Sequence, residues 1–166
     1  MFVTILCGII MMSGLFLMLL SGVGFIQDIK FFGSAPKEVR EAVPETKPER
    51  FKGQHAVGWV MAAFSVVMLI AAPVIGAVNG VHNSFGFMQH FIRFNVMWLM
   101  MKAFDVIFFD WVLLCNAGFD FFPRFYPETK EVLGHYLFGY NWKTHAAHII
   151  GGAAVSAILA WVCTLI

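Results

Sequence analysis

The sequence predicts an all-α integral membrane protein, a four-helix bundle with four transmembrane spans. Hydrophobic residues make up 60% of the 166 residues, charged residues make up 13%, and the mean hydropathy is +0.77. A soluble domain has about 25% charged residues, so this composition excludes a soluble globular domain and a disordered chain. The net charge of +1 also provides no field that would recruit a nucleic acid. The lipid bilayer is therefore the first expected partner, and residues 1–166 are expected to form a single transmembrane domain.

The first span is predicted over residues 2–27, where 26 consecutive residues have no charge. At about 1.5 Å per residue they reach roughly 39 Å, more than the ~30 Å hydrocarbon core. Residues 28–54 follow with eleven charged residues and three prolines. We expect a solvated cytoplasmic loop, with one short helix from Lys37 to Val43 that ends before Pro44.

The other spans are predicted over residues 56–81, 87–115 and 144–166. The third of the four is the most polar, and hydropathy alone should score it below the others. It contains four charged residues: Arg93, Lys102, Asp105 and Asp110. The short connection between residues 81 and 87 indicates an antiparallel hairpin. Residues 119–142 are rich in Phe, Tyr and Trp, including Tyr126, and are expected to anchor in the headgroup layer as an interfacial segment that prolines keep from forming one helix.

Small residues recur at intervals of four in two of the spans. The second span has Ala72, Gly76 and Gly80, and the fourth has Gly152, Ser156, Ala160 and Thr164. Such faces allow close helix packing, so we expect them to contact neighbouring helices, and a homodimer through either face would supply further walls for a transport path.

The distribution of Lys and Arg predicts the orientation. Six lie between the first two spans, none between the second and third, and three between the third and fourth. Positively charged connections stay inside, so both termini are expected outside the cytoplasm, in a cytoplasmic membrane of the bacterial type.

The third span contains the first candidate site. At 100° per residue, Asn95, Lys102, Asp105 and Asn116 fall within an arc of about 80°, and Lys102 and Asp105 are one turn apart. Charges at this depth are costly and should face the bundle interior. The stripe is interpreted as an ion relay or the polar floor of a substrate cavity; the alternative is a buried pair that only fixes helix register. Nearer the outer end, Arg93 is expected to extend to the headgroups, the alternative being a phosphate or carboxylate contact shared with His90 and His82.

Histidines define the second candidate site, at the inner surface. The topology brings His55, Asp110, His145 and His148 to similar depth, with His135 in the adjoining segment. His145 and His148 have a spacing that suits two ligands of one zinc, iron or manganese ion, or a base and its orienting partner. His55 with His145 or His148 could also ligate haem, although satisfied interfacial histidines are the favoured interpretation and the sequence names no cofactor.

Three function classes remain open. The first is a small, oligomeric transport or channel-type protein that handles an ion or small molecule at the stripe on the third span. The second is a membrane-embedded enzyme acting on a lipid-soluble substrate at the inner histidines. The third is a non-catalytic subunit or scaffold. The three cysteines are expected to be buried packing residues, with a Cys7–Cys163 disulfide as the alternative.

Overall fold

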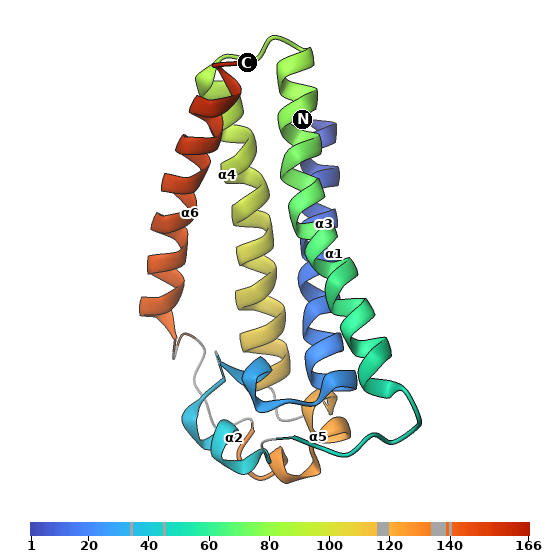
Figure 1. The fold of residues 1–166 in the computed structure, drawn as a ribbon. Helices are drawn as coiled ribbons and strands as arrows, with labels where there is room; N and C mark the ends of the chain where they lie inside the picture. The colour runs from blue at the N-terminus through green and yellow to red at the C-terminus, as the bar shows by residue number, and fades with distance from the viewer. Residues whose placement is uncertain (34, 45, 116–119, 134–138, 140) are drawn as a thin grey trace. The chain divides into compact units, whose positions relative to one another are not determined.

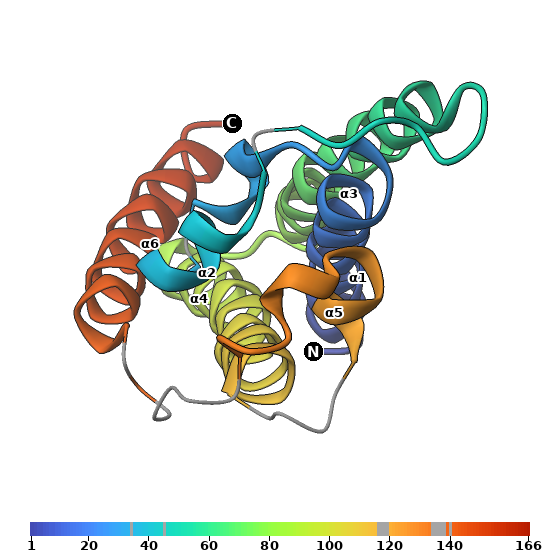
Figure 2. The same ribbon diagram turned by 90° about the horizontal axis from the view of Figure 1, so that it is seen from below.

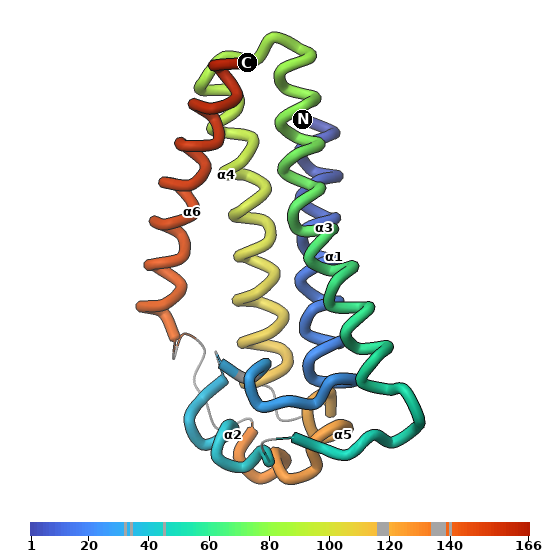
Figure 3. The backbone as a smooth tube through the Cα atoms, viewed as in Figure 1, coloured from blue at the N-terminus to red at the C-terminus, as the bar shows by residue number. Residues whose placement is uncertain are grey.

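The computed structural model is built from helices, as the sequence predicts. It describes residues 1–33, 35–44, 46–115, 120–133, 139 and 141–166, and no strand occurs among them. The elements in chain order are α1 (Phe2–Leu19), η1 (Leu20–Ile26), η2 (Ile29–Phe32), α2 (Lys37–Ala42), α3 (Gln54–His82), α4 (Phe87–Phe104), η3 (Asp105–Cys115), α5 (Phe121–Phe125), η4 (Pro127–Thr129) and α6 (Trp142–Cys163) (Figure 1). Two of them, η1 and η3, are π-helices that continue α1 and α4 without a break, as the tube in Figure 3 shows.

Three helices are long and apolar enough to cross a membrane: Phe2–Ile26, Gln54–His82 and Trp142–Cys163. Their positions match three of the four predicted spans. The remaining predicted span, residues 87–115, forms α4 and η3 but does not reach the same hydropathy, because α4 carries several polar residues, Arg93 and Lys102 among them. The chain thus has the helices of an integral membrane protein.

The chain divides into two compact units. Residues 1–15, 66–105 and 141–166 form the first unit, and residues 16–65 and 106–140 form the second. The helices α1 and α3 contribute residues to both. Each unit is described by itself below.

In the first unit, the most polar helix, α4, packs against all three apolar helices. Glycines make the close contacts: Gly8 of α1 faces Met100, Gly76 of α3 faces Met97, and Gly152 of α6 faces Trp98. A Cβ atom added to Gly8 or Gly152 would lie within 3.0 Å of these α4 side chains. Figure 1 shows α4 with α6 on one side and α1 and α3 on the other.

Polar side chains are buried in this unit and large apolar side chains are exposed. The buried polar residues include Thr4, His90, Arg93, Lys102 and Ser156. Many exposed apolar residues lie on the three apolar helices, among them Ile5, Leu6, Ile9, Val67, Ile70, Val74, Ile150, Val155 and Ile158, and α4 adds Met88, Ile92 and Leu99. In water, apolar side chains would be buried and polar side chains exposed, whereas a surrounding lipid bilayer favours apolar side chains on the outside.

Both stripes of small residues pack as the sequence predicts, except that Thr164 at the end of the second stripe is exposed. Ala72, Gly76 and Gly80 on α3 are buried, as are Gly152, Ser156 and Ala160 on α6. The two stripes contact α4 of the same chain; for example, Gly80 faces His90, and Ala160 belongs to a core cluster with Phe94. These faces therefore contact α4 within the chain, and the homodimer considered from the sequence stays a prediction.

The second unit includes the connector over residues 28–54. The predicted short helix is present as α2, and Val39 and Val43 are buried in a core cluster with Leu113, Phe122 and Leu133. Most charged side chains of the described part of this segment are exposed, as expected for a solvated loop. The sequence analysis did not identify the two buried valines, which attach the connector to the core of the second unit.

Two buried glutamines fix this connector to the end of η1. Gln27 ends η1 with a left-handed φ of 55°, and its Oε1 accepts a hydrogen bond of 2.9 Å from Nε2 of Gln54. The same Nε2 donates to the carbonyl of Phe25 at 2.7 Å, while Oε1 of Gln54 accepts from the backbone and Nε of Arg50. Arg50 in turn donates to the carbonyl of Gly24. Figure 2 views the chain from below, the end where α2 and α5 are drawn.

The described part of the aromatic segment is also folded. It forms α5 and η4, two short helices instead of one, as the prolines predict. Tyr126 is 0% exposed, so the prediction that it is an interfacial anchor is wrong. Burial raises its pKa, and the nearby carboxylates of Glu128 and Asp28 raise it further. Residues 116–119, 134–138 and 140 of the predicted segment and its approach lie outside the described residues.

Candidate functional site

Lys102 of α4 lies at the centre of a group of three titratable side chains in the first unit. Its Nζ donates to the carboxylate of Asp105, one turn later in the chain, and lies 3.3 Å from Nδ1 of His148 on α6. The Lys102 side chain is 8% exposed and that of Asp105 is 26% exposed, while His148 is exposed. The structure therefore brings together the predicted pair, Lys102 and Asp105, and adds a histidine that the sequence analysis assigned to a different site.

The local packing of α4 against α6 positions His148. The indole Nε1 of Trp98 donates to the carbonyl of His148 at 3.1 Å. Trp98 reaches this carbonyl because Gly152, one turn further along α6, has no side chain in the way. His148 precedes Gly152 by four residues, as Gly152 precedes Ser156. The sequence therefore contained a signal for this contact: the spacing of four residues places His148 on the same face of α6 as the small-residue stripe, the face that packs on α4.

The charges make this arrangement sensitive to protonation. A lysine ammonium has only donor hydrogens, so it is satisfied by an ionised Asp105 and by a neutral His148 whose Nδ1 accepts. A cation placed at Nδ1 would repel the Lys102 ammonium, so the contact as drawn is favourable when Nδ1 accepts.

Asn95 of the predicted stripe is not part of this group. Asn95 donates from Nδ2 to the carbonyl of Phe91 on its own helix at 3.1 Å, and it precedes Lys102 by seven residues, about 10 Å along the axis. Asn116 lies outside the described residues, so its place in the stripe stays a prediction.

The histidines predicted at the inner surface are divided between the two units. His145 and His148 belong to the first unit, and His55 and Asp110 belong to the second. His55 lies beside Glu49, with 3.8 Å between Nδ1 and Oε1, while Asp110 is buried on η3. His135 lies outside the described residues. The metal and haem interpretations of His55, Asp110, His145 and His148 stay predictions.

Metal-ligand geometry can be assessed within the described residues. They contain no group of three or more His, Cys, Asp or Glu side chains placed to hold one metal ion. Nδ1 of His148 faces the Lys102 ammonium, and a cation at this nitrogen would meet that positive charge. Nδ1 of His148 is thus placed for contact with Lys102.

Glu49 is an acidic group outside the predicted spans, and its pKa is lowered. Its carboxylate accepts hydrogen bonds from the backbone N–H groups of His55, at 2.9 Å, and of Gly53, at 3.1 Å. These bonds stabilise the ionised form and lower the pKa of Glu49, the His55 bond having the larger effect. Glu49 therefore caps the start of α3, and His55 is next to this cap.

The sequence analysis predicts that Arg93 extends to the headgroup layer, but the structure buries this side chain. It is 4% exposed and contacts α1 and α3: Nε donates to Oγ1 of Thr4 at 3.3 Å, and Nη1 donates to the carbonyl of Gly76. The prediction is wrong because the small residues of α3 leave a polar backbone carbonyl within reach of the guanidinium. Nearby, Cys7 and Cys163 are free thiols in the same core cluster, as expected for packing residues, and no disulfide joins them.

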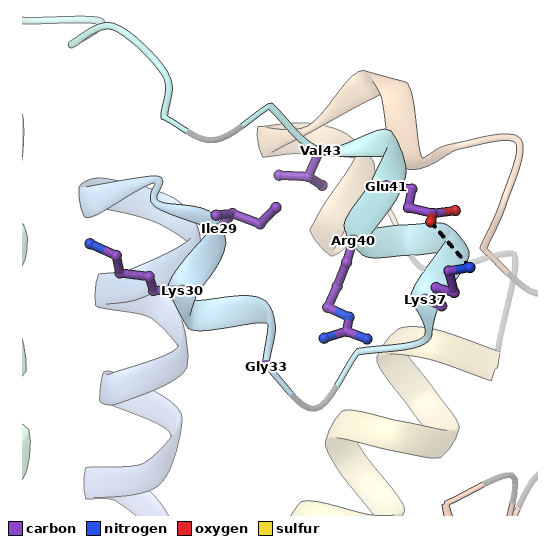
Figure 4. A pocket seen from close by; sticks show the side chains of 7 residues that line it. All are labelled: Ile29, Lys30, Gly33, Lys37, Arg40, Glu41 and Val43. Atoms are coloured by element: carbon purple, nitrogen blue, oxygen red, sulfur yellow. Dashed lines mark ion pairs between the residues drawn. The ribbon is translucent and has the colours of Figure 1, made fainter.

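The second unit has an open hollow of about 630 Å³ between η2 and α2 (Figure 4). Its lining residues are Ile29, Lys30, Gly33, Lys37, Arg40, Glu41 and Val43. Lys37 forms an ion pair with Glu41 at 3.4 Å, Lys30 points away from the hollow, and Arg40 extends into it. The exposed side chains are screened by solvent, so this surface has less capacity for specific binding than the buried groups of the first unit.

The groups best placed for chemistry among the described residues are therefore Lys102, Asp105 and His148. They form one polar contact between two helices that pack closely, α4 and α6. No protein-family model, no curated protein and no solved structure matches this chain, so its function has to be argued from these residues.

Proposed function

We propose that the protein is a four-span integral membrane protein that handles protons, or a small ion exchanged for them, through Lys102, Asp105 and His148. The observation that carries the proposal is the position of the Lys102 ammonium, held between the carboxylate of Asp105 and Nδ1 of His148 on a different helix. Such a group suits a transport or channel-type protein, because the protonation of its side chains and the packing of α4 against α6 depend on one another.

The fourth span in this proposal is α4 together with η3. The 18 residues of α4 reach about 27 Å at 1.5 Å per residue, and the 11 residues of η3 extend the helix further. A charged side chain at the centre of a bilayer costs roughly 2.5–3.5 kcal/mol on insertion scales. Burial of Lys102 against Asp105 and of Arg93 against α1 and α3 lowers this cost, which supports a membrane position for α4.

The orientation proposed is that both termini face away from the cytoplasm of a bacterial-type cell. The basic residues between α1 and α3 and between η3 and α6 support it. Single cysteines introduced by Glu41→Cys and Asn83→Cys test the orientation with a membrane-impermeant maleimide. We expect labelling of Asn83→Cys in intact cells and of Glu41→Cys only after permeabilisation; the opposite pattern would refute the orientation.

The mechanism we propose begins with His148 neutral and Lys102 shared between its two partners. A proton that enters at exposed His148 repels the ammonium, which moves toward Asp105 and loosens the contact between α4 and α6. When the proton leaves, Nδ1 again accepts from Lys102 and the contact is restored. Proton movement is thereby coupled to a change in the packing of two helices.

Proton flux in proteoliposomes tests this proposal. Vesicles of phosphatidylcholine and phosphatidylglycerol would contain a trapped pH-sensitive dye, and a potassium diffusion potential would drive protons inward. We expect flux with the wild-type protein and its loss in His148→Asn and in Asp105→Asn. The matched control is His145→Asn, which changes a histidine one turn away and should retain flux.

The outcomes separate the three function classes. Equal flux in His148→Asn and the wild type would refute the proposal. Equal loss in His145→Asn and His148→Asn would favour the enzyme interpretation based on the inner histidines. An intact fold and unchanged flux in the double variant Lys102→Met, Asp105→Leu would refute the proposal in favour of a buried pair that only fixes packing, as in a scaffold.

A further inference from the structure

Arg93 is a buried cation without an anionic partner. Its three contacts are with the hydroxyl of Thr4, the carbonyl of Gly76 and the ring of Phe85, whose centroid lies 4.4 Å from Cζ. None of the ion pairs among the described residues includes it. A guanidinium has five N–H donors, so two bonds to neutral oxygens leave most of its donors unused. A buried charge that is not neutralised is costly, and this cost favours the binding of an anion.

A cavity of about 190 Å³ opens beside this guanidinium in the first unit. Its apolar walls include Phe85, Ile92 and Val96, and its polar lining comes from Thr4, Gln89 and Arg93. Oε1 of Gln89 accepts from the backbone N–H of Gly86 at 2.8 Å, which leaves its amide N–H groups available at the wall. The cavity thus combines one buried cation and neutral donors with mostly apolar walls.

We infer that this cavity binds the anionic group of an amphiphile, a carboxylate or phosphate that is attached to an acyl chain. The guanidinium supplies charge and paired donors for such an oxygen anion. The apolar walls suit the first methylene groups of a chain, and they offer nothing to a fully hydrated ion. Pockets for drug-sized ligands have volumes of about 300–1,000 Å³, so a cavity of 190 Å³ suits a head group or the end of one chain.

This site is separate from the group around Lys102. Arg93 precedes Lys102 by nine residues on α4, about 13 Å along the helix axis, and none of the residues that line the cavity contacts Asp105 or His148. The inference therefore does not rest on the proposed proton function, and it can hold or fail independently of it.

Binding to the delipidated, detergent-purified protein tests the inference. The probes are phosphatidylglycerol and oleate as anionic amphiphiles, oleyl alcohol as a neutral chain, and inorganic phosphate as a free anion. We expect the two anionic amphiphiles to raise the thermal unfolding midpoint of the wild type, and the neutral chain and the free anion to leave it unchanged. An equal shift with inorganic phosphate or with oleyl alcohol would overturn the inference.

Variants then assign the binding to Arg93. Arg93→Gln should bind phosphatidylglycerol about tenfold to a hundredfold more weakly, as expected for the loss of a charge-assisted hydrogen bond. Val96→Phe, which fills the cavity and leaves the charge in place, should also weaken binding. The matched control is Arg40→Gln in the open hollow of the second unit, which should bind like the wild type.

The sign of the stability change is a further test. Without anionic lipid, Arg93→Gln should be at least as stable as the wild type, because it removes an unpaired buried charge. With saturating phosphatidylglycerol, the wild type should become the more stable of the two. Equal lipid-induced stabilisation of Arg93→Gln and the wild type would overturn the inference.

Discussion

Replacing Gly152 with alanine tests whether α4 and α6 pack as closely as the structure shows. A Cβ atom at this position would lie 1.9 Å from Nε1 and 2.3 Å from Cδ1 of Trp98. The indole is held there by the hydrogen bond from Nε1 to the carbonyl of His148, so it cannot rotate away without losing that bond. The added methyl group must therefore move Trp98 or separate the two helices.

The magnitude follows from three contributions. Overpacking of a well-packed contact costs about 1–3 kcal/mol. Loss of the Trp98 hydrogen bond costs about 0.5–1.5 kcal/mol. Alanine has a higher helix propensity than glycine, which stabilises the variant by about 1 kcal/mol and offsets part of these costs. We expect Gly152→Ala to lower the free energy of unfolding by about 0.5–3.5 kcal/mol.

Gly151→Ala is the matched control, because a Cβ atom at Gly151 meets nothing within 4 Å. It carries the same change in propensity one residue earlier and should raise the free energy of unfolding by up to about 1 kcal/mol. The assay is reversible unfolding in mixed micelles, followed by far-UV circular dichroism and tryptophan fluorescence. Equal stability of the two variants would refute the packing of Trp98 against α6.

Three further predictions concern the second unit. Because burial raises the pKa of Tyr126, this side chain ionises at lower pH in the unfolded chain than in the folded one. The free energy of unfolding should therefore be highest below about pH 10 and fall as pH rises above it. Tyr126→Phe should remove this dependence in unfolding measured from about pH 9 to about pH 11. The lowered pKa of Glu49 has the opposite sign: its stabilisation of the start of α3 should be full above the ordinary value of about 4.3 and be lost as pH falls further, and Glu49→Gln should abolish this change in NMR titrations of the flanking amides. Gln54→Leu leaves Oε1 of buried Gln27 without its Gln54 donor and should cost about 1–3 kcal/mol, whereas Gln89→Leu on the more exposed face of α4 should cost less than half as much in the same chemical unfolding experiment.

Local and periodic features were predictable from the sequence. The uncharged stretches predicted three helices able to span a membrane, and the spacing of small residues predicted which faces of α3 and α6 pack closely. The pair of Lys102 and Asp105 was also predictable, since two residues one turn apart on a helix are neighbours whatever the rest of the fold does. The helix from Lys37 follows from the same local reasoning, with Pro44 limiting its length.

Tertiary structure decided the features that depend on contact between distant segments. The sequence placed His148 with His145 because they are close in the chain, but the packing of Trp98 on Gly152 turns its Nδ1 toward Lys102. The position of Arg93 near a helix end predicts a headgroup anchor. In the structure Arg93 is a buried cation, because the carbonyl of Gly76 is within reach of its guanidinium.

The buried side chain of Tyr126 and the two buried valines of the connector follow the same pattern. From the sequence, Tyr126 was assigned to the headgroup layer and the two valines to a solvated loop. They are buried because η3, α2 and α5 meet and form a core there. The sequence by itself determined which segments are helical, which are apolar enough for lipid and which residues are neighbours along a helix. Only the tertiary structure decided which polar groups face one another, because that depends on the distance of closest approach between helices, which single glycines set.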